Sequence, residues 1–449
     1  MTVSTKLPTP TTPPPNTPSS ARYHLGSLIT GKLARASGLM FVATVGGGIL
    51  GYVFQILMGR MLSVPDYGLF ITLMALLAVV GVPLGALNMV VTRRASDYRA
   101  QNQPERIAVM FWWVNRRLLW IALTVVLCTL PFTPWLRDYF LLGSLVSVWI
   151  LLLLVLVLPF LPINLAFLQA QQNFRWLAIN GLAVQGFKIL FCTTLVYAGF
   201  KLNGALIGMV IALIATWLLT CWPLRFLVGL SAGTCVTGGH ISPRGAIPVF
   251  IATLSYVVMT QIDIMLVNHY YTAHQAGVYA AAATLGKAVM FLPGAIAIAM
   301  FPMVAENESR AQGSAHLFLN AMVLTAALAG AGALFYFLLA DEIITLLYGQ
   351  KFQGAAELLK IYGFAMLPMT LVMVAEHFLI AKGRVIFAYV MILGIPIVLL
   401  AANTYHDSLT DMVYILAACG WGLAVLGFGV IGIQYFYEKF SKEKLHVTL

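Results

Sequence analysis

Residues 145–168 read LVSVWILLLLVLVLPFLPINLAFL and contain no ionisable side chain. The hydrocarbon core of a bilayer is about 30 Å thick, and about 20 apolar residues span it as an α-helix. Because lipid offers no water to the backbone, an isolated apolar run in a membrane must satisfy its hydrogen bonds internally, as a helix does. The stretch therefore predicts a membrane-spanning helix.

Similar apolar runs follow one another along almost the whole chain. Hydrophobic residues make up 61% of the sequence and charged residues 9%, against roughly 25% charged in soluble domains. We predict an all-α membrane protein with twelve transmembrane helices. The longest connection between spans, residues 93–117, is too short for a large extramembrane catalytic domain. The predicted spans are 37–61, 68–92, 118–135, 140–168, 176–199, 204–229, 246–271, 277–305, 317–340, 358–381, 385–402 and 412–436.

The net charge of +11 is unevenly distributed between the two ends of these spans. Basic residues gather in both tails and in the loops after even-numbered spans, so the positive-inside rule places both termini in the cytoplasm. The charge thus reflects topology, with some attraction to anionic lipid, and not a nucleic-acid partner. The side predicted as cytoplasmic carries Lys6, Arg22, Lys32, Arg35, Arg93, Arg94, Arg99, Arg106, Arg116, Arg117, Lys382, Arg384, Lys439, Lys442 and Lys444, and the opposite side carries Arg60, Arg137, Lys201 and Lys351.

The segments outside the spans are short. Residues 1–35 include a Pro-, Thr- and Ser-rich stretch that cannot bury a core and predicts a disordered cytoplasmic tail. Residues 230–245 predict a cytoplasmic linker, and residues 437–449 a basic tail. The five scattered cysteines form no disulfide or metal pattern. Because no nucleotide-binding motif is present either, we expect no cofactor.

A repeated helix start divides the chain into two halves. Ser63, Asp66 and Gly68 correspond to Thr272, Gln275 and Gly277 at an offset of 209 positions. A Ser or Thr followed three residues later by an acceptor side chain is typical of a capping box at a helix N-terminus.

A weaker match pairs the Phe-Leu-x-Ala sequences at residues 167–170 and 378–381. The two matches together predict six-helix bundles over residues 36–229 and 246–436. With an even number of spans in each half, these bundles are related by a pseudo-two-fold axis along the membrane normal and enclose a central cleft.

These motifs also resemble a known family. The residues that carry the resemblance are Leu57, Arg60, Leu62, Ser63, Pro65, Asp66, Tyr67, Gly68, Leu69 and Phe70 in the first hairpin, and Gln261, Asp263, Leu266, Gly277, Val278, Tyr279, Phe301 and Pro302 in the second half. Over residues 36–436 the chain resembles the polysaccharide biosynthesis, or oligosaccharide flippase, family of the multidrug/oligosaccharidyl-lipid/polysaccharide exporter superfamily. Its fourteen-span relatives fit less well, because this sequence has twelve predicted spans.

The resemblance implies a transporter without a catalytic motif, not an enzyme. Such proteins move undecaprenyl-pyrophosphate-linked oligosaccharides from the inner to the outer leaflet of the bacterial plasma membrane. It further implies membrane lipid as a partner, coupling to protons or sodium, and contact with a polysaccharide polymerase or glycosyltransferase complex.

Lys188 lies near the middle of a predicted span, about 16 Å from either end. A charge at that depth needs a partner or water. Lys188 is therefore predicted to face the cavity and attract an anionic head group, and a helix–helix hydrogen bond or ion pair is the alternative.

Asp263 and Lys287 have matching depths of about 12 and 15 Å in adjacent antiparallel spans. They are expected to lie in one layer. Two interpretations stay open: the two charges simply neutralise each other, or protonation of Asp263 or binding of an anion to Lys287 breaks the pair and shifts the two halves.

The remaining candidate charges lie nearer the ends of spans. Arg93 and Arg94 enforce topology or meet a pyrophosphate at the cytoplasmic entrance. Arg60 pairs locally or contacts substrate, and Glu376 forms an interfacial ion pair or a proton relay. The predicted substrate-binding residues are thus Lys188, Lys287, Arg93, Arg94 and Arg60, and the predicted ion-coupling residues are Asp263 and Glu376.

Other functions were weighed against the flippase. A cation-coupled multidrug exporter could use Asp263 and Glu376 to bind a cationic drug, but Lys188 and Lys287 favour anions. A membrane glycosyltransferase or polymerase needs a larger outward loop than residues 341–357. A noncatalytic scaffold in a polysaccharide synthase complex stays open at this point.

Overall fold

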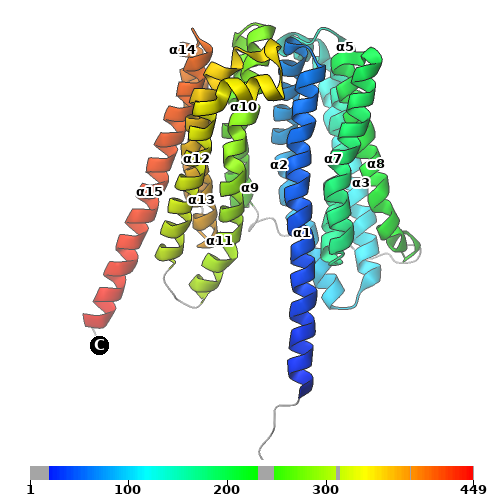
Figure 1. Cartoon of the computed structure of the whole chain (residues 1–449). Coiled ribbons are helices and arrows are strands. Elements are labelled where there is room, and N and C mark those ends of the chain that lie inside the picture. Colours follow the sequence, from blue (N-terminus) through cyan, green and yellow to red (C-terminus); the bar gives the residue numbers. More distant parts are fainter. Residues whose placement is uncertain (1–19, 231–246, 310–313, 385, 448–449) are drawn as a thin grey trace, which may run out of the picture.

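The computed structural model describes residues 20–230, 247–309, 314–384 and 386–447, and within them every regular element is a helix (Figure 1). Predicted features on residues 1–19, and almost all of the predicted linker 230–245, lie outside this part of the chain. The first half holds α1 (Ser20–Met61), α2 (Val64–Ala100), α3 (Pro104–Thr129), η1 (Leu130–Phe132), α4 (Thr133–Tyr139), α5 (Leu145–Val157), α6 (Phe160–Ala170), α7 (Phe174–Leu195), η2 (Val196–Phe200) and α8 (Lys201–Leu230). The second half holds α9 (Ile247–Tyr270), α10 (Ala273–Gly286), η3 (Lys287–Met290), α11 (Phe291–Ser309), α12 (Ala315–Leu347), η4 (Gln350–Phe352), α13 (Ala355–Ala381), α14 (Ile386–Thr404) and α15 (Leu409–Val447).

The described helices contain 11 runs that are long and apolar enough to cross a membrane. The longest, Phe174–Leu227, comprises two helices. The chain reverses between them, where Gly199 and Lys201 have φ angles of 93° and 49°, and α7 packs along α8. The described part of the chain therefore makes twelve crossings, as predicted.

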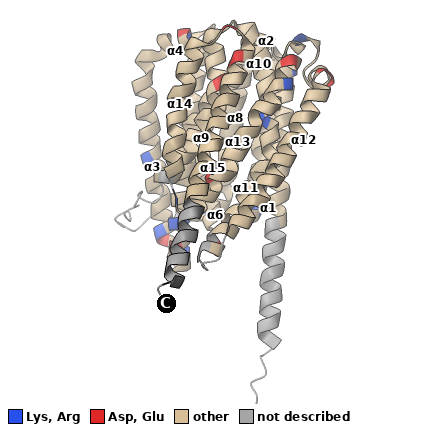
Figure 2. Ribbon diagram, turned by 90° about the vertical axis from the view of Figure 1, so that its left-hand side faces the viewer, with Lys and Arg blue, Asp and Glu red and all other residues tan. Residues whose placement is uncertain are grey.

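The crossings form two bundles that stand side by side in Figure 1. Helices α1 to α8 make one bundle and α9 to α15 the other, and α2 joins them by packing against both α9 and α10. This arrangement agrees with the predicted two-bundle fold. Most charged residues lie near the two ends of the helices (Figure 2). We call these ends the Ser63 face, which carries the turn after α1, and the Gln101 face, which carries the turn after α2.

Helices extend beyond the predicted spans in three places. Helix α2 runs on to Ala100 and α3 begins at Pro104, so residues 93–117 form a helical hairpin with a short turn. A separate apolar cluster, which includes Ile107, Phe111 and Phe167, holds the hairpin against α6 and α8. Helix α1 already begins at Ser20, within the predicted tail 1–35, and α15 extends to Val447, within the predicted tail 437–449.

The repeated helix starts have the predicted capping contacts. The hydroxyl of Ser63 accepts a hydrogen bond from the Asp66 backbone N–H at 3.2 Å and donates one to the Asp66 carboxylate at 2.7 Å. Thr272 and Gln275 form a complete capping box, in which the Gln275 side chain also accepts from the Thr272 backbone N–H. These contacts satisfy backbone donors that a helix N-terminus leaves without partners.

The two repeats also contact each other across the halves. A Cβ atom on Gly68 would lie 2.6 Å from the backbone nitrogen of Gly277, and one on Gly277 would overlap the Val64 carbonyl. The N-termini of α2 and α10 can approach this closely because both positions lack a side chain. The sequence repeat thus marks one place where the two bundles meet.

We predict that Gly208→Val destabilises the first bundle. A Cβ on Gly208 of α8 would lie 2.6 Å from the Cys192 Cα of α7, and overpacking of this kind costs about 1–3 kcal/mol. The control is Gly186→Val on α7, where an added Cβ meets nothing within 4 Å. Thermal unfolding of the detergent-purified proteins should show a lower midpoint for Gly208→Val alone, and equal midpoints would contradict the packing described.

Candidate functional site

A cavity of about 270 Å³ lies between the two bundles. Both halves contribute to it, so it corresponds to the predicted central cleft. Its polar side chains come from α1, α9, α10 and η3. The lining residues are Tyr52, Gln55, Ile71, Met74, Ala75, Ala78, Gln261, Ile264, Thr284 and Lys287.

The charged group in this wall is Lys287, and its partner is Asp263. The Lys287 Nζ lies 3.2 Å from Asp263 Oδ1 and donates a second hydrogen bond to Gln261 Oε1 at 3.4 Å. The Asp263 side chain is 2% exposed and that of Lys287 14%. The antiparallel arrangement of α9 and α10 thus places the two charges in one layer, as their depths in the sequence indicate.

Two tyrosines complete the surroundings of the Asp263 carboxylate. Tyr279 donates a hydrogen bond to Oδ2 at 3.1 Å, and Tyr362 of α13 donates one at 2.5 Å. Both phenols are fully buried. With donors on both oxygens, a carboxylate in an apolar bundle is stabilised in one position. Asp263 in turn fixes the Lys287 ammonium at the cavity wall.

The sequence analysis did not include these tyrosines in the site. Tyr279 belongs to the second repeated helix start, so the sequence repeat drew attention to its position. Tyr362 had no such signal, because it is 99 positions from Asp263 in the chain. Gly286 makes room for it, because a Cβ there would overlap the Tyr362 ring. Only the packing of the helices shows that α13 supplies a hydrogen-bond donor to the carboxylate.

Lys287 stands where the helix geometry changes. Residues 287–290 form a short 3-10 segment between α10 and α11. Such a segment within a spanning helix often marks a hinge or functional position. An ammonium group has three N–H donors, and the Asp263 and Gln261 contacts account for two of them. The arrangement leaves Lys287 able to donate a hydrogen bond into the cavity, beside the amides of Gln55 and Gln261.

Lys188 is not among the residues that line the cavity, but it lies at about the same height along the bundle as the cavity-lining residue Gln55. It is half-buried on α7, and no hydrogen bond or ion pair to it is found among the described residues. Gly47 and Gly51 of α1 face Gly181 and Gln185 of α7. Continuing this register by one turn places Lys188 at the level of Gln55, so its predicted role in attracting head groups stays a prediction.

The other predicted site residues are not gathered around the cavity. Arg60 lies at the Ser63 face and donates hydrogen bonds to the carbonyls of Leu346 and Leu347 in the other half. Arg93 is exposed and Arg94 is half-buried, both on α2 toward the Gln101 face.

Glu376 on α13 is also separate from the cavity lining. Its side chain is 4% exposed, and no hydrogen bond or ion pair to it is found among the described side chains. The predicted interfacial ion pair of Glu376 is therefore not present in that part of the chain.

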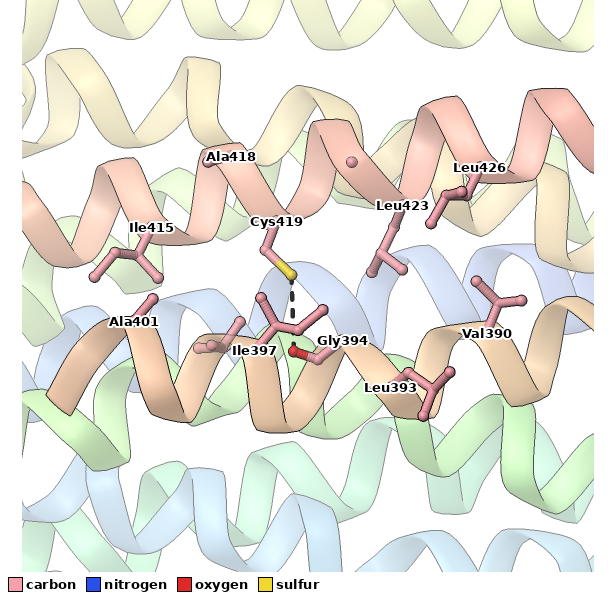
Figure 3. A pocket seen from close by; sticks show the side chains of 12 residues that line it. Val390, Leu393, Gly394, Ile397, Ala401, Ile415, Ala418, Cys419, Leu423 and Leu426 are labelled. Atoms are coloured by element: carbon pink, nitrogen blue, oxygen red, sulfur yellow. Dashed lines mark hydrogen bonds between the residues drawn. The ribbon is translucent and has the colours of Figure 1, made fainter. Parts of the chain in front are cut away.

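A second cavity, of about 460 Å³, lies between α14 and α15 (Figure 3). Aliphatic side chains such as Leu393, Ile397 and Leu426 dominate its wall, and all three are strongly exposed. The hydrogen bond drawn there joins Cys419 Sγ to the Gly394 carbonyl at 3.8 Å. Its lining contains neither a charged nor an amide side chain, so it suits hydrocarbon and not a polar head group.

A family model described as polysaccharide biosynthesis protein matches residues 57–357. The chain belongs to this family. The match covers the repeated helix starts, Asp263 with Lys287 and Tyr279, and all of the cavity-lining residues except Tyr52 and Gln55. It confirms the resemblance seen in the sequence motifs.

Solved structures of two transporter groups share the fold of this family member. An inward-facing multidrug resistance MATE family transporter of the MOP superfamily aligns with a TM-score of 0.71 at 12% identity, over 87% of this chain and 96% of that one. The lipid II flippase MurJ in an inward closed conformation aligns with a TM-score of 0.69 at 13% identity, over 88% of this chain and 87% of that one. A search of curated protein sequences finds no significant match.

We predict that Tyr362→Phe destabilises the protein. The substitution removes a donor from a buried carboxylate, and hydrogen bonds to charged groups contribute about 1.5–3 kcal/mol. Tyr336→Phe on α12 is the control, because no hydrogen bond of that phenol is found among the described residues. Thermal unfolding in detergent should separate the two variants, and similar midpoints would show that the Tyr362 hydroxyl contributes little.

Proposed function

We propose that the protein flips prenyl-pyrophosphate-linked oligosaccharides from the inner to the outer leaflet of a bacterial plasma membrane. The observation that supports this most directly is the cavity between two duplicated bundles, with the Lys287 ammonium in its wall. Membership in the polysaccharide biosynthesis family supports the same function independently of the cavity.

The chemistry of the cavity matches the head group of such a lipid. A pyrophosphate offers anionic oxygens to Lys287, and sugar hydroxyls can exchange hydrogen bonds with Gln55, Gln261 and Thr284. Binding sites for drug-sized ligands have volumes of about 300–1,000 Å³. At about 270 Å³, the cavity has room for part of a head group, so the prenyl chain stays in lipid while the halves separate to admit the rest.

In our proposal the Gln101 face is cytoplasmic and the Ser63 face is outside. The support is the excess of arginine at the Gln101 face, since short cytoplasmic loops carry the surplus of Lys and Arg. Arg93 and Arg94 then lie on the route by which a pyrophosphate approaches the cavity, and Lys188 lies at the cavity level. A membrane potential that is negative inside favours outward movement of an anion by about 2.3 kcal/mol per charge per 100 mV.

The Asp263–Lys287 pair supplies a switch for this cycle. A pyrophosphate oxygen at Lys287 competes with the Asp263 carboxylate for the same ammonium. Protonation of Asp263 also weakens the pair, because it removes the negative charge that Lys287 contacts, and this offers a point for proton coupling. Glu376 is the second coupling candidate, because a buried carboxylate without a partner in the described residues requires a proton or a cation.

A cation-coupled multidrug exporter is the second candidate function. It needs a carboxylate that can reach a cationic drug in the cavity. Asp263 is instead buried behind Lys287 and accepts hydrogen bonds from two tyrosines. This arrangement favours an anionic ligand.

We predict that Lys287→Gln and Asp263→Asn each slow flipping by about tenfold or more, because each breaks a charge-assisted contact of about 1.5–3 kcal/mol. The measurement is transbilayer movement of a fluorescent prenyl-pyrophosphate-linked oligosaccharide in proteoliposomes. Lys360→Gln is the control, since Lys360 forms ion pairs with Asp341 and Glu357 near the Ser63 face. Wild-type rates for both site variants would rule out the switch.

We also predict selective binding of anionic head groups. A short prenyl pyrophosphate should raise the thermal unfolding midpoint of the wild type, since ligands that bind only the folded state stabilise it. The shift should be lost in Lys287→Gln. If a cationic dye stabilises the protein and the pyrophosphate does not, the exporter is the better assignment.

A further inference from the structure

At the Ser63 face, each half supplies a cation to the end of a helix in the other half. Arg60 at the end of α1 donates through Nε to the Leu347 carbonyl at 2.8 Å and through Nη2 to the Leu346 carbonyl. Lys351 in η4 donates to the carbonyls of Arg60 at 2.9 Å and Leu62 at 2.5 Å. The final carbonyls of a helix have no partner within it and carry partial negative charge. The ends of α1 and α12 are thus capped reciprocally.

Aromatic side chains from both halves lie beside these caps. The Tyr67 ring of α2 lies 5.6 Å from that of Tyr348 and 5.5 Å from that of Phe352, and the two hydroxyls are 3.0 Å apart. All three rings are buried. Gly59 admits Tyr348, because a Cβ there would overlap its ring. We call Tyr67, Tyr348 and Phe352 the aromatic plug.

The aromatic plug is connected to the cavity by one side chain. The Tyr67 hydroxyl lies 3.5 Å from the hydroxyl of Thr284, which lines the cavity. The plug therefore stands between the cavity and the Ser63 face. The contact of Gly68 with Gly277 brings the two bundles together at the same end.

We propose that the aromatic plug and the reciprocal caps of Arg60 and Lys351 form the gate that closes the cavity at the Ser63 face. This inference rests on the proposed function, because a gate is needed only if the cavity opens at the Ser63 face during transport. The caps suit reversible opening, since Arg60 and Lys351 are exposed and water can replace the carbonyls when the halves separate. The plug excludes water while the gate is closed, because its rings are packed against one another across the interface.

The gate predicts a measurable change in access to the cavity. In a variant with all cysteines replaced, Ala78→Cys places a thiol at the cavity lining. A membrane-impermeant maleimide is applied to right-side-out and to inside-out vesicles, so the side of access is measured and not assumed. Combining Arg60→Gln with Lys351→Gln should raise the labelling rate from the Ser63 face by at least about threefold through a shift of the closed–open equilibrium.

Two further variants sharpen the test. Tyr348→Ala should raise labelling from the same face, and Lys351→Arg should keep the closed rate because it retains a cation at the cap. Arg137→Gln is the matched control: Arg137 lies at the same end of the bundle but pairs with Asp138 in its own half. Should Tyr348→Ala not insert, the paired change at the exposed Arg60 and Lys351 carries the test.

Unchanged labelling in the double variant would overturn the gate, and so would an equal rise in Arg137→Gln. The labelling experiment needs no substrate, so it is independent of the flipping assay. A faster reaction together with no flipping of the prenyl-pyrophosphate lipid by the wild type would leave the gate standing and reject the substrate class.

Discussion

A carboxylate that stays charged inside an apolar bundle needs hydrogen-bonding or ionic partners, and much of the arrangement around the cavity follows from the partners of Asp263. Its oxygens accept hydrogen bonds from Lys287, Tyr279 and Tyr362. These donors come from α10, the start of η3, and α13, so one side chain on α9 joins that helix to three other elements of the second half. The same contacts hold a cation in the wall of the cavity between the halves.

The two halves meet through three physically different kinds of contact. Gly68 and Gly277 allow backbone contact, the aromatic plug excludes water, and the caps of Arg60 and Lys351 join helix ends at the surface. Close packing gives the interface its geometry, while exposed polar contacts are exchanged for water at little cost. An interface of this composition can separate and re-form, as the proposed alternating-access cycle requires.

Local patterns in the sequence were sufficient for several features of the fold. The twelve spans follow from the length of the apolar runs, and the capping contacts at Ser63 and Thr272 follow from residues three positions apart. The pairing of Asp263 with Lys287 could be anticipated because a short hairpin fixes the relative depth of its two helices. The continuation of α2 to Ala100 and the start of α3 at Pro104 were missed, since the polar and charged residues of this region end the hydropathy signal although the helices extend into it.

The sequence by itself determined the membrane class, the number of crossings and the duplication, because these depend on composition and short-range order. Only the tertiary structure decided which charges share a site: it brought Tyr362 to Asp263, placed Arg60 against the end of α12 and left Glu376 apart. Those outcomes depend on the rotation and register of helices that are distant in the chain. Lateral packing sets both, through positions such as Gly59 and Gly286, and a single sequence does not encode that packing locally.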